Sequence, residues 1–145
     1  MRVDFYQLTR DPAEAVLPLI ARNTIAAGER LLVVSADESQ LGRIGEELWS
    51  RLPETFLAHG VAGGDHDARQ PILLSDRMEP ANGARYVVLA DGQWRDPDGA
   101  FERAFLLFDE ITIQAARGKW RELGERPGIE RNFWRQDGGK WTKVA

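Results

Sequence analysis

Leu31-Leu32-Val33-Val34 is an unbroken apolar segment with the length of one β-strand. A strand of this kind is typical of a parallel sheet, where both faces of the sheet are covered. Residues 2–8 are rich in β-forming side chains, and Asp11-Pro12 then supplies an N-cap and a proline suited to the first turn of a helix. We therefore predict a strand, a helix that runs to about Ala27, and a second strand.

The segments after this strand continue the alternation. Asp37 and Gln40 form a start like a capping box for a second helix, which should end at Pro53. Further elements are expected as strands at 55–58, 71–75, 85–90 and 104–108 (the last of the core sheet), a loop at 60–70, a helix at 109–122, and a hairpin of 132–135 and 140–144. The sequence predicts one α/β domain over residues 1–145, with a three-layer, doubly wound, mostly parallel sheet, helices on both faces and a C-terminal β-hairpin.

Composition and charge exclude several classes of protein. The chain has 145 residues, 43% of them apolar, and it contains no cysteine, which excludes disulfides and thiolate metal ligands. The charged, strand-like N-terminus and the lack of a long uncharged apolar run lead us to expect a cytoplasmic protein without membrane contact. The net charge is -4, yet residues 115–145 carry eight basic and four acidic residues, so that this region is cationic.

Motifs for catalysis are absent from the sequence. Neither a Walker loop nor a Gly-x-Gly-x-x-Gly turn follows the first strand, and there is no Gly-x-Ser-x-Gly elbow. Adjacent carboxylates at Asp37-Glu38, Glu46-Glu47 and Asp109-Glu110 diverge on a helix, and the first and third pairs suit helix N-termini. We expect a non-catalytic protein without a cofactor. The fold class leaves open an enzyme that uses a nucleotide near Ser35 and Asp37.

Four residues form the one sequence cluster that could ligate a metal ion: His59, Asp65, His66 and Asp67. The alternative is that His66 lies in a solvated, glycine-rich loop and that His59 ends a short strand and hydrogen-bonds locally. We predict no metal site.

Four residues of the predicted C-terminal helix share one face: Arg117, Trp120, Arg121 and Gly124. Apolar residues lie towards the other face: Ile113, Ala116 and Leu123. Two guanidinium groups beside an indole can bind a carboxylate and a neighbouring apolar ring, which suits an acidic peptide that ends in an aromatic residue. Alternatively, Trp120 packs against the C-terminal hairpin, and the arginines are solvated or pair with Glu125 and Glu130.

With these features placed, the chain resembles the chi subunit family of the bacterial DNA polymerase III holoenzyme. The residues that carry the resemblance occur in the family's order: Val3-Asp4-Phe5-Tyr6, Gly28 to Val34 followed by Asp37, Leu48-Trp49, Pro53, Phe56, His59, Gly63, and Arg117 to Arg121 leading into Phe133-Trp134. The resemblance implies a non-catalytic α/β adaptor that binds the acidic C-terminal tail of single-stranded DNA-binding protein. It also implies a link to the clamp loader, through a psi subunit in many bacteria, and only indirect contact with single-stranded DNA.

The resemblance assigns roles by position. Arg117 would meet the terminal carboxylate of the tail, Trp120 would lie beside the pocket, and Arg121 would flank it. Phe108 or Ile113 would form the floor of that pocket. Ile113 stands where the family has a lysine, a loss of charge for which Arg126 or Arg131 would compensate.

A second surface follows the second helix, although core packing is the alternative explanation for its residues. The resemblance implies that it binds psi, another clamp-loader component or a repair helicase, and its residues are Trp49, Pro53 and Phe56. Ala58 replaces a proline usual in the family.

A rival function is direct binding of single-stranded DNA through the basic C-terminal region. Trp120, Trp134 and Trp141 alternate there with the basic residues and could stack on bases.

Overall fold

The computed structural model describes residues 1–52, 54–97 and 99–145, and its elements alternate as the sequence predicts. Their bounds are β1 (Arg2–Gln7), α1 (Ala13–Ala26), β2 (Leu31–Val34), α2 (Glu38–Ser50), β3 (His59–Val61), the 3-10 turn η1 (Asp67–Arg69), β4 (Ile72–Ser75), β5 (Tyr86–Leu89), β6 (Arg103–Phe108), α3 (Ile113–Gly124), β7 (Glu130–Asp137) and β8 (Lys140–Lys143). The predicted end of α2 at Pro53 falls outside the described residues. None of the described helices has the length and apolar character needed to cross a membrane.

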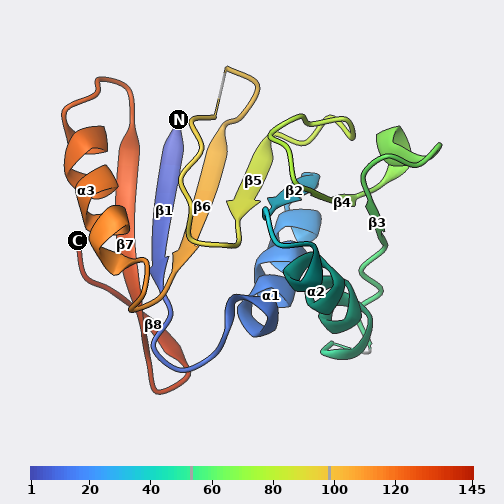
Figure 1. Cartoon of the computed structure of the whole chain (residues 1–145), viewed down its shortest axis with the longest axis horizontal. Helices are drawn as coiled ribbons and strands as arrows, with labels where there is room; N and C mark the ends of the chain where they lie inside the picture. Colours follow the sequence, from blue (N-terminus) through green and yellow to red (C-terminus); the bar gives the residue numbers. More distant parts are fainter. Residues whose placement is uncertain (53, 98) are drawn as a thin grey trace.

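The strands form one sheet in the order β3-β4-β2-β5-β6-β1-β7-β8. All neighbours are parallel except β7 and β8, which form the antiparallel C-terminal hairpin. Helices α1 and α2 cover one face, and α3 packs on the other face against β1, β6 and β7 (Figure 1). The predicted fold class is confirmed.

Strand β2 shows why the apolar segment 31–34 is decisive. Its side chains alternate between the two layers: Leu31 and Val33 pack with α1 and α2, whereas Leu32 and Val34 pack on the side of α3. All four residues are fully buried, so each face of the strand needs an apolar side chain. Asp37 then caps α2, as predicted, because its carboxylate accepts from the backbone N–H groups of Ser39 and Gln40.

The strand predicted at residues 55–58 is wrong, and so is part of the loop predicted after it. Strand β3 begins at His59 because the register with β4 pairs His59 with Ile72 and Val61 with Leu74. Leu57 is buried beneath α2, but Phe56 is 79% exposed and belongs to no strand. An apolar segment alone did not reveal which residues meet β4.

Two predicted helix starts are also wrong, for the same physical reason. The Asp109 carboxylate accepts hydrogen bonds from the backbone N–H groups of Ile111 and Thr112, which forms a turn, and α3 begins only at Ile113. Asp11 accepts from the side chain of Gln136 on β7, and Pro12 is the N-cap of α1. In both cases the aspartate satisfies donors outside the helix.

The prediction that residues 104–108 form the last strand of the core sheet is wrong as well. Strand β7, longer than the predicted 132–135, extends the sheet by pairing in parallel with β1. Without it, β1 would be an edge strand, although its Val3 and Phe5 are fully buried. Strands β1 and β2 are themselves separated by β5 and β6.

We expect Asp91, at the end of β5, to make folding stability sensitive to acid. Burial alone would raise the pKa of its carboxyl group, but hydrogen bonds from Arg95 and from the backbone of Ala36 and Gln93 outweigh burial and hold the pKa below its usual value. A lowered pKa stabilises the fold above the carboxyl pKa of the unfolded chain, and this stability is lost as the pH falls through the folded value.

Asp91→Asn should therefore lower the free energy of unfolding at neutral pH by about 1–3 kcal/mol, since it loses charge-assisted hydrogen bonds. It should also lose less stability than the wild type on acidification below about pH 4. Urea unfolding across this pH range measures both effects. Equal losses on acidification in the two proteins would contradict the assignment.

Candidate functional site

Helix α3 is held on the sheet by an aromatic cluster of Phe5, Phe108, Trp120 and Phe133. The Phe5 ring meets Trp120 edge-on at 5.3 Å between centroids and stacks on Phe133 at 6.1 Å. Trp120 also meets Phe133 edge-on at 5.5 Å. Such offset and edge-on contacts are favourable beyond the apolar area that they bury, so Trp120 is first of all the anchor of α3.

The side of α3 that faces the sheet contains one residue that was predicted on the other side, Trp120. Ala116 and Leu123 are buried, and Ile113 and Trp120 pack partly buried against the same core. Placing Trp120 on the opposite face from these residues is therefore wrong, because its ring turns towards β1 and β7. Its packing against Phe133 on β7 agrees with the alternative that Trp120 contacts the C-terminal hairpin.

Arg117 and Arg121 point away from this core and are exposed. Neither forms a hydrogen bond or ion pair with any residue that the structure describes. Arg126, in contrast, pairs with Asp96 and Glu122. The two arginines of the predicted site are thus available to a ligand, while Arg126 is engaged.

Arg131 on β7 completes this region. From the sequence it was expected only as one of two basic residues that could compensate for the missing lysine at position 113. Its guanidinium carbon lies 4.1 Å from the centroid of the Trp120 ring, and its Nη1 donates to the Trp120 carbonyl at 2.6 Å. Gly124 makes this approach possible, because a Cβ there would lie 2.6 Å from the guanidinium carbon. We call Arg117, Trp120, Arg121 and Arg131 the α3 site.

The two residues expected to floor the pocket lie below this surface. Phe108 is 1% exposed and contacts the rings of Phe5 and Phe133, so that it belongs to the buried part of the aromatic cluster. Ile113 is partly buried at the start of α3. Both residues adjoin the α3 site through packing.

Trp49 and Phe56 come together at the other end of the sheet. Their ring centroids are 5.6 Å apart, and the side chains are 57% and 79% exposed. The imidazole of His59 lies 5.1 Å from Trp49. Pro53, the third residue predicted for this surface, lies outside the described residues. We call Trp49 and Phe56 the Trp49 patch.

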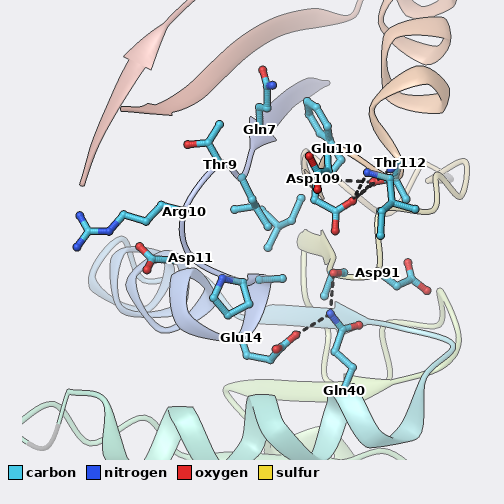
Figure 2. Close-up of a pocket in the computed structure, with 18 residues that line it drawn as sticks. Gln7, Thr9, Arg10, Asp11, Glu14, Gln40, Asp91, Asp109, Glu110 and Thr112 are labelled. Atoms are coloured by element: carbon cyan, nitrogen blue, oxygen red, sulfur yellow. Dashed lines mark hydrogen bonds between the residues drawn. The ribbon is translucent and has the colours of Figure 1, made fainter. Parts of the chain in front are cut away.

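A cavity of about 630 Å³ opens at the carboxyl ends of β1, β5 and β6, where an α/β fold often binds nucleotides (Figure 2). Its charged lining residues are five carboxylates and one arginine: Asp11, Glu14, Asp91, Asp109, Glu110 and Arg10. This charge repels phosphates. Ser35 is buried and donates to Gln40, and Asp37 caps α2, so neither residue is free for the nucleotide chemistry left open by the sequence.

The His59 side chain makes a local contact, whereas His66 is exposed. The Nδ1 atom of His59 lies 3.0 Å from the Leu57 carbonyl oxygen, and Asp67 accepts from the backbone N–H groups of Gly63 and Gly64. No group of three or more potential metal ligands gathers within residues 1–52, 54–97 and 99–145.

Comparison with known proteins agrees with the resemblance seen in the sequence. The family described as "DNA polymerase III chi subunit, HolC" matches residues 1–129. The chain is 27% identical over 127 residues to DNA polymerase III subunit chi of Escherichia coli, covering 81% of this chain and 86% of that protein. It is 31% identical over 130 residues to the subunit of the same name from Pseudomonas aeruginosa, covering 86% and 90%. Arg131 lies beyond the family match.

Two glycines of α3 provide a test of the contact between Arg131 and Trp120. A Cβ at Gly118 meets no atom within 4 Å, so Gly118→Ala should raise the free energy of unfolding by about 0.5–1 kcal/mol through helix propensity alone. Gly124→Ala should gain less or lose stability, because Arg131 must leave the Trp120 ring. Urea unfolding measures the difference, and an equal gain in both variants would show that this contact contributes little.

Proposed function

Because the chain belongs to the DNA polymerase III chi subunit family, we propose that it is a non-catalytic replication adaptor that binds the acidic C-terminal tail of single-stranded DNA-binding protein at the α3 site. The adaptor would link this tail to the clamp loader, directly or through psi, in the bacterial cytoplasm. Its contact with single-stranded DNA in this role would be indirect.

The observation that carries the proposal is the pair of unengaged guanidinium groups on α3. Arg117 and Arg121 are four residues apart, so their side chains extend from the same side of the helix. A guanidinium binds a carboxylate through two parallel hydrogen bonds, which suits the free carboxylate at the end of a peptide. The partly exposed edge of Trp120 next to them offers an apolar contact to an aromatic side chain of that peptide.

Arg131 supplies a positive charge in place of the one that the site lacks at Ile113. A lysine would have placed a cation one turn before Arg117, and this chain has an apolar residue there. Arg131 places a cation over the C-terminal half of α3 instead, stacked on the same indole. Arg126 is the poorer compensating residue, because two carboxylates already neutralise it.

The Trp49 patch supports a second interface, for psi, another clamp-loader component or a repair helicase. Large exposed aromatic side chains that touch each other are enriched in the energetic centres of protein interfaces. Strand β3 is one edge of the sheet, and β7 and β8 form the other, so the Trp49 patch and the α3 site are far apart in the strand order. Two partners could therefore bind at the same time, as an adaptor requires.

We expect a peptide that ends in acidic residues, an aromatic residue and a free carboxylate to bind with an affinity that falls as salt is raised. Arg117→Ala should weaken binding by about tenfold or more, as expected for the loss of a charge-assisted hydrogen bond. Arg131→Ala should cause a smaller loss, and Arg126→Ala is the matched control with little effect. Calorimetric titration gives the affinities. Similar losses for Arg117→Ala and Arg126→Ala would rule out the assigned pocket.

Replacing both residues of the Trp49 patch by alanine should lower affinity for purified psi from a related bacterium but leave binding of the tail peptide unchanged. Ile111→Ala serves as the control, because Ile111 is a comparably exposed apolar residue elsewhere on the surface. Surface plasmon resonance with each ligand distinguishes the two interfaces. Retained psi binding in the double variant would exclude the patch as its interface.

A further inference from the structure

The face of the sheet opposite α3 carries a row of aromatic rings on β1, β7 and β8. Helix α1 packs over β2, and α2 packs over β3 and β4, so this end of the face is occupied by Tyr6, Trp134 and Trp141. The pairing of β1 with β7 sets Tyr6 beside Trp134, with ring centroids 6.5 Å apart, and Trp141 meets Tyr6 at 4.8 Å. All three side chains are partly exposed. We call this region the aromatic face.

A small cavity adjoins the aromatic face where the second half of α1 passes over β5 and β6. Its volume is about 140 Å³, close to that of a protein cavity that holds benzene. Tyr6, Tyr86 and Arg103 line it from the sheet, and Asn23 and Ala27 line it from α1. It therefore combines the size of one flat ring with hydroxyl, amide and guanidinium groups on its walls.

Arg103 is held beside this cavity by two contacts. Its guanidinium lies 4.4 Å from the centroid of the Phe105 ring, and it donates to Asp4 at 2.8 Å. Asp4 is fully buried and also accepts from Arg2 and Trp134, so that one hidden carboxylate orients two arginines and an indole. Burial also raises the pKa of Tyr6, whose hydroxyl group therefore stays protonated and able to donate.

This face carries both cations and carboxylates. Arg2, Arg103 and Lys143 share the face by strand register, together with Glu130. Asp4 pairs with both arginines, and Asp11 accepts a hydrogen bond from Gln136 on the same face. Asn132 lies on the same face beside Asp4. It is 6% exposed, and its Nδ2 has no hydrogen-bond partner among the described residues. A buried donor of this kind is costly without an acceptor.

We propose that the aromatic face and its cavity bind single-stranded DNA directly, with one base in the cavity and neighbouring bases stacked on Trp134 and Trp141. Lys143, which forms no ion pair with a described residue, supplies a cation for the phosphates, and Arg2 and Arg103 add donors that they share with Asp4. Stacking on aromatic side chains tolerates any base sequence. This site lies on the opposite face of the sheet from Trp120. The DNA-binding alternative predicted from the sequence grouped Trp120 with Trp134 and Trp141, but the fold places them on different faces. The site is independent of the proposed adaptor function, and both could operate together.

The test is a pair of variants at the end of α1. Ala27 lines the cavity and is exposed, so Ala27→Phe should fill it without disturbing the core. Ala26→Phe adds the same ring at an exposed neighbouring residue that does not line the cavity. Fluorescence anisotropy with a labelled oligothymidylate in low salt should show binding to the wild type that weakens as salt is raised. Ala27→Phe should reduce affinity roughly fivefold or more, the effect of one stacked base, and Ala26→Phe should not.

Three results would overturn this proposal: no binding by the wild type in low salt, equal affinities of the two phenylalanine variants, or loss of DNA binding in Arg117→Ala. Weaker binding of the acidic tail peptide to Ala27→Phe would also overturn it, because the face would then accept a peptide. Unaltered tail binding and thermal unfolding in Ala27→Phe show that the variant is folded. Failure of the tail peptide to bind the wild type would count against the adaptor function alone.

Discussion

Contact between Phe5 and the rings around it determines how α3 lies on the sheet. Phe5 is buried in β1, the strand that joins β6 to β7, and it touches Phe108, Trp120 and Phe133. Because Ala116, Trp120 and Leu123 all face this core, the two residues that flank this side of α3 lie towards solvent. These residues are Arg117 and Arg121. The orientation of the two cations therefore follows from the side of α3 that packs on the sheet.

Local patterns predicted the parts of the fold that depend on neighbouring residues. The strand at residues 31–34 and the helix cap at Asp37 were both predicted correctly, because burial of a strand and capping of a helix depend on residues close together in the sequence. Strand β7 was underestimated because its role comes from pairing with β1, at the other end of the chain. The prediction that a helix begins at Asp109 was wrong, because an aspartate that precedes a helix can equally well stabilise a turn.

The candidate site shows the same division. Helical spacing correctly placed Arg117 and Arg121 together, but it could not tell that Trp120 turns towards the sheet, since this depends on Phe5 and Phe133. Arg131 comes from a strand that follows α3, and its contact with Trp120 rests on the absence of a side chain at Gly124. A glycine near the end of a helix has several explanations, so sequence alone could not identify this one.

The distribution of chemistry over the molecule agrees with an adaptor. The cavity at the strand ends is acidic, and Ser35 and Asp37 beside it are engaged in structural hydrogen bonds. The exposed features proposed for binding lie towards the two ends of the sheet instead, as cations on α3 and as aromatic rings at the Trp49 patch. The fold thus places the two proposed surfaces at opposite ends of one mostly parallel sheet.

The most direct test of the central claim is to titrate the nitrogen-15 amide spectrum of the protein with the acidic tail peptide. If the tail binds at the α3 site, shift changes will concentrate on residues 113–124 and on Arg131 and Phe133, with the largest changes near Arg117. Changes concentrated instead at the Trp49 patch or around the acidic cavity, with α3 unaffected, would contradict it.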